Sequence, residues 1–240
     1  MTSSSAAVSL MAPTAPACAP LPRAGSILVV TARPGQESAD LGGLLYAFRR
    51  TGASLALLCL TRGEASPLNS TCARLEAIRP WEVQLAASVL GISRVTVADY
   101  PDGALGRYPV AELGERVRHA IRWHSADLLL VIDPAAGDPG DAAVAAAACA
   151  AARQADLPTL ARTVPGAPGA WMIDLGTDVA TARAIQKSAA AAHASQSEAL
   201  PELERCLDRL DGREQLRWLV SPPQTPRFSR SREPISCPRP

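Results

Sequence analysis

Residues 26–38, SILVVTARPGQES, join an apolar run to a polar loop, and the helix-like segment 40–45 follows directly. Apolar runs of this kind, separated by helices, are typical of strands buried in a mostly parallel sheet. The crevice of such a sheet opens at the carboxyl ends of its strands. The loop over 31–38, with its arginine, glycine and glutamine, is therefore placed where functional side chains usually gather.

The alternation of short apolar runs and helix-length segments continues along the chain. It predicts an α/β fold, Rossmann-like and doubly wound, with a mostly parallel sheet and helices on both faces. Two of the predicted helices are followed by glycine, at Gly52 and Gly91, as helix ends commonly are. The predicted strands are 26–32, 54–60, 94–99, 127–132 and 170–175, and the predicted helices are 38–50, 72–90, 109–124, 141–155, 178–198 and 201–218.

The chain of 240 residues is long enough for one domain with a substantial core. We expect this α/β domain over residues 25–220. Residues 1–24, rich in Ala, Ser and Pro, and residues 221–240, rich in Pro and Arg, bury too little apolar surface to fold and are expected to be disordered tails.

The net charge of +1 argues against a nucleic-acid-binding protein, because duplex binding needs clustered Lys and Arg. The six cysteines form no C-x-x-C pair. The most apolar stretch, 142–152, is about half the ~20 residues that a membrane helix needs, and the N-terminus is a poor secretory signal. We therefore expect a cytoplasmic protein that does not act at a membrane.

Two common site types are absent from the sequence. The first strand-end loop lacks the G-x-G-x-x-G of a dinucleotide site, since Gly42 and Gly43 fall inside the predicted helix. No G-x-S-x-G elbow of a serine hydrolase occurs. Polar residues and glycines instead fill the loops after the first four predicted strands, which should line the crevice. These loops are 33–37, 61–64, 100–103 and 133–141.

The collinear order of these motifs resembles the LmbE/PIG-L family of metal-dependent N-deacetylases, over about residues 25–200. The resemblance rests on TARPGQES, LTRGEASP, IRPWEVQLAASVLGISRV, YPDGAL, ADLLLVIDPAAGDPGDAAVAAAACAAARQA and MIDL…KSAAAAHASQ. It implies an ancestral crevice for an N-acetylated sugar, with a zinc ion as cofactor.

In the family the first loop reads A-H-P-D-D-E and the fourth ends in H-P-D-H. The resemblance places the family's metal-binding histidine and aspartate on Arg33 and Gln36, its general base on Gly35, and its H-P-D-H on residues 138–141. Of these key positions, three match the family, namely Pro34, Glu37 and Pro139.

The departures matter because zinc needs imidazole, thiolate or carboxylate donors, and a catalytic site generally offers three. The Arg33 guanidinium has no lone pair to give. Gln36 is a weak oxygen donor, which leaves Asp141 as the single good ligand, and Gly35 cannot take a proton from water. We therefore expect no bound metal or other cofactor, and no confident catalytic residue.

Arg33 is expected to occupy the vacant metal position as a fixed cation, paired with Asp138 or Asp141. The histidines do not replace the missing ligands. His119 and His124 fall at the far end of a predicted helix, and His193 matches a histidine of the family's H-x-S-Q segment that supports the site rather than binding metal.

Other positions of the family's pattern are retained, including Glu82 and the second-loop residues Arg62 and Glu64. In the sugar deacetylases the residues that correspond to Arg79 and Asp102 contact substrate. Salt bridges at a helix start or within a loop would explain the same residues without a ligand. The predicted ligand-binding residues are Arg33, Glu37, Arg79, Asp102, Asp138, Asp141 and His193.

The sequence thus favours a non-hydrolytic pseudoenzyme that binds a sugar-like or acylated small molecule, a partner enzyme or another copy of itself. One alternative is an active N-deacetylase or amide hydrolase with a rearranged zinc site, built from Glu37, Asp40, Asp138 or Asp141. Another is a metal-free enzyme of a different class that uses Arg33 with Asp138 or Asp141.

Overall fold

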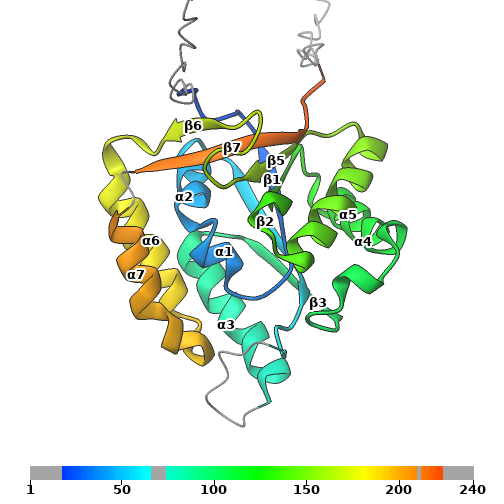
Figure 1. The fold of residues 1–240 in the computed structure, drawn as a ribbon, viewed down its shortest axis with the longest axis horizontal. Helices are drawn as coiled ribbons and strands as arrows, with labels where there is room; N and C mark the ends of the chain where they lie inside the picture. Colours follow the sequence, from blue (N-terminus) through cyan, green and yellow to red (C-terminus); the bar gives the residue numbers. More distant parts are fainter. Residues whose placement is uncertain (1–17, 66–73, 210–211, 224–240) are drawn as a thin grey trace, which may run out of the picture.

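The computed structural model describes residues 18–65, 74–209 and 212–223. Within them, one sheet of seven strands has the order β3-β2-β1-β4-β5-β7-β6 (Figure 1). The strands are β1 (Ser26–Thr31), β2 (Ser54–Thr61), β3 (Arg94–Tyr100), β4 (Leu128–Ile132), β5 (Thr159–Arg162), β6 (Trp171–Asp174) and β7 (Arg213–Val220).

The centre of the sheet is parallel because its strands are apolar on both faces and lie between two helical layers. In β1 every residue from Ile27 to Thr31 is buried, and Ile27 aligns with Leu55 of β2 and Leu128 of β4. Strands β1 to β5 run in one direction, while β7 is antiparallel to both β5 and β6. The predicted fold class, α/β with a mostly parallel sheet, is confirmed.

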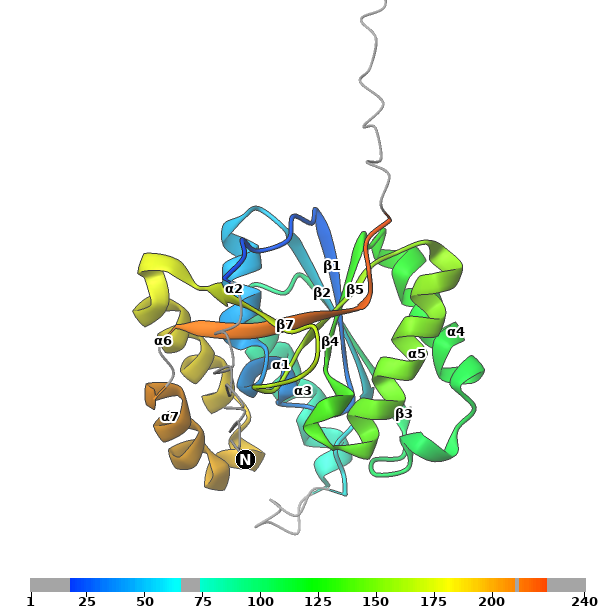
Figure 2. The same ribbon diagram turned by 45° about the horizontal axis from the view of Figure 1, so that its top comes forward.

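Helices cover both faces of the sheet (Figure 2). The α4–α5 pair packs on one face, over the apolar side chains that include Leu28, Val30 and Leu129, and α1, α2, α3 and α6 cover the other. Helix α7 packs against α6. The helices are α1 (Gln36–Ala39), α2 (Gly42–Arg50), α3 (Leu75–Leu90), α4 (Val110–His124), α5 (Pro139–Ala155), α6 (Val179–Ala191) and α7 (Leu200–Arg209), with 3-10 turns η1 (Leu105–Arg107), η2 (Pro134–Ala136), η3 (Gly176–Asp178) and η4 (Ala194–Ala199).

The predicted helix 38–50 is two helices, α1 and α2, which meet near Gly42. A Cβ atom at Gly42 would lie 2.7 Å from Cγ of Gln186 on α6. Only glycine allows α2 and α6 to approach this closely. The turn between α1 and α2 fixes the direction of Asp40, which proves to face the pocket described below.

The prediction of one helix over 201–218 is wrong beyond α7, because residues 213–220 form strand β7. The Asp-Gly step at 211–212 is a turn signal, and Glu214 and Leu216 point to the same buried side of a strand. Strand β5 was not predicted either, because four residues are too few to show a clear hydrophobic pattern.

Residues 18–24, which belong to the predicted N-terminal tail, are among the described residues. Cys18 forms a β-bridge with Met172, and the Ala19 N–H donates to the Met172 carbonyl at 2.8 Å. Residues 1–17 and 224–240, which make up most of the predicted tails, lie outside the described residues. Among the described helices, none has the length and apolar character to cross a membrane.

Candidate functional site

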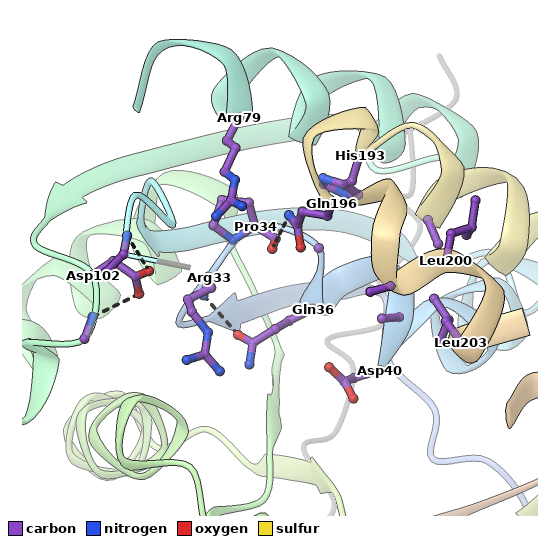
Figure 3. A pocket seen from close by; sticks show the side chains of 16 residues that line it. Arg33, Pro34, Gln36, Asp40, Arg79, Asp102, His193, Gln196, Leu200 and Leu203 are labelled. Atoms are coloured by element: carbon purple, nitrogen blue, oxygen red, sulfur yellow. Dashed lines mark hydrogen bonds between the residues drawn. The ribbon is translucent and has the colours of Figure 1, made fainter. Parts of the chain in front are cut away.

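A pocket of about 560 Å³ opens at the carboxyl edge of the sheet, beside β1 (Figure 3). Part of its wall comes from the first three strand-end loops and from α3, and the rest from α6, η4 and α7. The residues that line it are Arg33, Pro34, Gly35, Gln36, Ala39, Asp40, Ala65, Arg79, Asp102, Gly103, Ala190, His193, Gln196, Ala199, Leu200 and Leu203.

Arg33 forms the predicted ion pair with Asp138, with 2.8 Å between Nη2 and Oδ2. Because β1 and β4 are neighbours, the loops that follow them meet at this point. Asp138 also caps α5, since its Oδ1 accepts from the N–H groups of Gly140 and Asp141. The pair is half-buried rather than buried, with 37% and 29% of the two side chains exposed.

These contacts keep Asp138 ionised. Burial alone would raise the pKa of Asp138, but hydrogen bonds from Arg33 and from the Asp141 N–H outweigh it, so that the pKa lies below its usual value. A cation and an anion are thus fixed at the edge of the pocket, with the guanidinium of Arg33 in its wall.

Gln36 uses both ends of its amide within the site. Its Oε1 accepts from the N–H groups of Ala32 and Arg33 at 3.0 Å, and its Nε2 donates to Oδ1 of Asp141 at 2.8 Å. Asp141 is 5% exposed. Its burial raises the pKa of Asp141, although the Gln36 hydrogen bond counteracts this.

Gly35 turns the loop into α1 with a φ of 98°, in the left-handed region that favours glycine. A Cβ atom at this position would lie 3.0 Å from Oε1 of Gln196. The Gln196 amide is held there by a hydrogen bond from its Nε2 to the Pro34 carbonyl, at 3.1 Å. A larger side chain at Gly35 would therefore be strained and would have to displace Gln196.

Glu37 and His193 form a contact behind the pocket wall, with 2.6 Å between Glu37 Oε1 and His193 Nε2. Ser38 Oγ donates to the same Glu37 oxygen at 3.0 Å, and the Gly35 N–H donates to the other oxygen at 2.9 Å. Glu37 is fully buried and does not line the pocket, whereas His193 does. This arrangement ties α1 to the segment between α6 and η4.

Arg79 and Glu82, both on α3, hold η4 through Ser195. Ser195 Oγ donates to Glu82 Oε2 at 2.7 Å and accepts from Arg79 Nε at 3.2 Å, while the Ser195 N–H donates to Glu82 Oε1. Arg79 also donates to the carbonyl of Gly63. Burial lowers the pKa of Arg79, and this residue lines the pocket while Glu82 does not.

Asp102 lines the pocket from the loop after β3. Its carboxylate accepts from the N–H groups of Ala65 at 3.2 Å and Gly103 at 2.9 Å. Glu64 accepts from the Asp102 N–H at 2.8 Å and thereby joins the second and third loops. Glu64 and Arg62 lie in a separate, smaller hollow.

Of the wall formed by α6, η4 and α7, the sequence indicated only His193, which directly precedes η4. The loop after the fourth predicted strand was expected to line the crevice. Asp138 and Asp141 are not among the pocket-lining residues, but they bond to Arg33 and Gln36, which are. The missed wall is largely apolar and consists of Ala190, Ala199, Leu200 and Leu203, together with Gln196. The i, i+3 spacing of Leu200 and Leu203 was the available signal, since it places both on one face of a helix.

Asp40 follows α1 and faces the pocket next to this apolar wall. Its side chain is 38% exposed, and it lines the pocket. Burial raises the pKa of Asp40 from 3.8 to about 6, against the opposing effect of Arg162.

Among the described residues, no three His, Cys, Asp or Glu side chains gather in a way that could hold a metal ion. His119 and His124 lie on α4, away from the pocket-lining residues. Around the first loop the site instead has the Arg33–Asp138 ion pair, the Gln36 amide bonded to the Asp141 carboxyl, and the Asp40 carboxyl facing the pocket.

The amino-acid sequence of the chain is similar to that of a known protein family. Residues 28–152 match the PIG-L family, described as GlcNAc-PI de-N-acetylase. A curated relative, the probable N-acetyl-alpha-D-glucosaminyl L-malate deacetylase 2 of Bacillus anthracis, is 27% identical over 113 residues. The match covers 45% of this chain and spans half the length of that relative.

Two solved structures show the same fold. The N,N'-diacetylchitobiose deacetylase of Pyrococcus horikoshii superposes with a TM-score of 0.67 and 17% identity, over 82% of this chain and 84% of its own. The 4-carboxy-2-hydroxymuconate hydratase of Pseudomonas putida KT2440 superposes with a TM-score of 0.65 and 16% identity, over 83% of this chain and 98% of its own.

Proposed function

The chain belongs to the PIG-L family, and we propose that it is a non-hydrolytic member, which binds a sugar-like or acylated small molecule in the pocket beside β1. In this proposal the zinc ligands and the general base of the family's deacetylases have been replaced. What remains is a pocket with polar groups on one side and an apolar wall on the other.

The observation that carries the proposal is the bonding at the positions that correspond to the family's metal ligands. Arg33 is paired with Asp138, and Gln36 donates to Asp141. Zinc binds neutral imidazole, thiolate or carboxylate groups, whereas a guanidinium has no lone pair to offer. The residues present do not fit a zinc ion, and we derive no catalytic step through one.

The position of the general base supports the same conclusion. Gly35 has no side chain to accept a proton from water. Its φ of 98° and the closeness of Gln196 leave little room for one. A deacetylase mechanism would need another base, and Glu37, the nearest acidic residue in the loop, is fully buried and bonded to His193.

Recognition groups for a small molecule remain in the pocket. Arg33, Arg79, Asp102 and Gln196 line the pocket, and each belongs to a different segment of the chain. Pockets that bind small molecules typically combine an apolar surface with a few fixed polar groups.

An active deacetylase with a rearranged zinc site is the main alternative, and the name of the Bacillus anthracis relative is the reason to test it. Such a site would draw on Glu37, Asp40, Asp138 or Asp141. Since two of these four are bonded to His193 and Arg33, they would have to give up those partners. A metal-free reaction at Arg33 is a further alternative, because the hydratase shows that this fold is not restricted to deacetylation.

The proposal is tested by measuring binding and turnover of N-acetylglucosamine in one sample. We expect saturation-transfer NMR to show sugar bound to the protein, and proton NMR to show no release of acetate when zinc is supplied. Acetate release that a chelator abolishes would establish the active alternative. Failure to bind N-acetylglucosamine and its free-amine and glucose counterparts would reject a sugar-like ligand.

A further inference from the structure

We propose that Asp40 is the principal ligand-binding anion of the pocket and that it takes a primary amine carrying an apolar group. In this arrangement the ammonium donates to the Asp40 carboxylate, and the apolar group packs on Ala190, Leu200 and Leu203. The inference rests on the proposed function, because it names the chemical class of the ligand for the same pocket.

The Asp40 carboxylate faces the pocket, and its ion pair with Arg162 is long. Its nearest basic group is Arg162, with 3.7 Å between Arg162 Nη1 and Asp40 Oδ1, which is beyond hydrogen-bond distance. Within the described parts of the chain, no group donates a hydrogen bond to this carboxylate. Figure 3 shows it in the opening between Gln36 and Leu203.

The other polar groups that line the pocket have partners in the protein. Asp102 accepts from two backbone N–H groups, Gln36 uses both ends of its amide, and Arg33 is paired with Asp138. A carboxylate held away from bulk water without a donor is costly. Asp40 is therefore the group in this wall that gains most from a donor supplied by a ligand.

The charges around Asp40 favour a cationic donor over a neutral one. Arg162 of β5 is shared with Glu214 of β7, at 3.4 Å, and Arg33 is engaged by Asp138. Glu37 of α1 and Asp141 of α5 add negative potential at Asp40. Arg162 and Arg33 act in the opposite direction. Because each of these arginines is also paired with another carboxylate, an ammonium would provide additional charge compensation as well as hydrogen-bond donors.

The surroundings of Asp40 select the rest of the ligand. Ala39, Ala190, Leu200 and Leu203 also line the pocket, so that an alkyl group packed on them would be removed from water. A free carboxylate in the ligand would meet Asp40 with like charge and is disfavoured there.

A series of three probes with one alkyl chain and different head groups tests the assignment. Hexylamine, hexanol and hexanoate are titrated into the 240-residue protein at about pH 7.5, and binding is followed by calorimetry and by chemical shift changes. We expect hexylamine to bind about tenfold more tightly than hexanol, with hexanoate the weakest. The Asp40→Asn variant should lose the preference for the amine but keep the binding of hexanol.

Two controls accompany the series. Glu198→Gln removes an exposed carboxylate of η4 that does not line the pocket, and it should leave all three affinities unchanged. In the unmodified protein, hexylamine binding should weaken as the pH falls through about 6, because Asp40 becomes protonated while the amine stays charged. His193 also lines the pocket. The Asp40→Asn variant shows whether the pH dependence comes from Asp40, because this variant should lose it.

Equal binding of hexylamine and hexanol, tighter binding of hexanoate, or no binding of any probe would overturn the assignment of Asp40. None of these results bears on zinc content or on acetate release, which test the proposed function separately. A protein that hydrolyses N-acetylglucosamine but still prefers hexylamine through Asp40 would refute the proposed function and leave this inference standing.

Discussion

The contact between Arg33 and Asp138 shows which residue-level interactions the sequence can predict. The pair was predicted because a cation and two carboxylates occur in loops that follow neighbouring strands, and it is present. The sequence does not indicate which of the two aspartates, Asp138 or Asp141, pairs with Arg33. That depends on the α5 N-terminus, where Asp138 caps the helix and Asp141 is turned towards Gln36.

Replacing the two members of this pair separates a charge contact from a helix cap. Asp138→Ala removes both, and we expect the free energy of unfolding to fall by about 1–2 kcal/mol. Arg33→Met removes only a half-exposed ion pair, and the loss should stay below about 1 kcal/mol. Urea denaturation measures both, and equal losses would show that the cap contributes nothing.

Asp40 makes stability depend on pH in a defined direction. Its pKa is about 6 in the folded protein and near 3.8 when unfolded, so that folding takes up a proton between these values. Stability attributable to Asp40 therefore falls as pH rises from about 4 to 6, and the cost persists above that range.

The Asp40→Asn variant should accordingly be more stable than the natural protein at neutral pH. The difference should be about 1–2 kcal/mol, after allowance for screening of a partly exposed carboxyl, and should vanish near pH 4. Denaturation at several pH values, with Glu198→Gln as the control, measures it. A destabilised Asp40→Asn protein at neutral pH would show that the carboxylate has a stabilising partner.

At the scale of elements, the sequence analysis assigned strand β7 and most of the 3-10 turn η4 to helices. Both depend on contacts between distant segments. The η4 turn is held by Glu82 of α3 through Ser195, and β7 is fixed by pairing with β5 and β6. Strands β1, β2 and β4, in contrast, are apolar along nearly their whole length, and they were predicted.

The placement of β7 predicts a large effect at Glu214. This side chain is 3% exposed and pairs with Arg183 of α6, which is 8% exposed, at 2.8 Å. Glu214→Ala would leave the Arg183 guanidinium buried without its charge partner, and we expect a loss of about 3 kcal/mol or more. Thermal and urea unfolding test this, with Glu115→Ala on the exposed face of α4 as a control that should change little. A loss below about 1 kcal/mol would mean that Arg183 finds another partner.

For the whole molecule, the order of the strands brings the candidate site together. The first, second and third loops and the N-terminus of α5 meet because β3, β2, β1 and β4 are adjacent. That much followed from the sequence, through the doubly wound pattern. The final shape of the pocket did not follow from the sequence, because α6, η4 and α7 close it from residues 179–209, far along the chain from β1.

The fold alone does not determine the chemistry at this crevice, since a deacetylase and a hydratase share it. The central claim is that the bonds of Arg33 with Asp138 and of Gln36 with Asp141 replace a metal site. If so, the protein should have no tight site for zinc, whereas restoring donor side chains should create one.

Zinc content measured by elemental analysis tests this claim most directly. The natural protein and an Arg33→His, Gln36→Asp, Asp141→His variant are equilibrated with zinc and desalted. Gly35 is kept, because its φ of 98° disfavours a larger residue. We predict little zinc in the natural protein and about one ion per chain in the variant. About one tightly held zinc per chain in the natural protein would contradict the account, whatever the variant does.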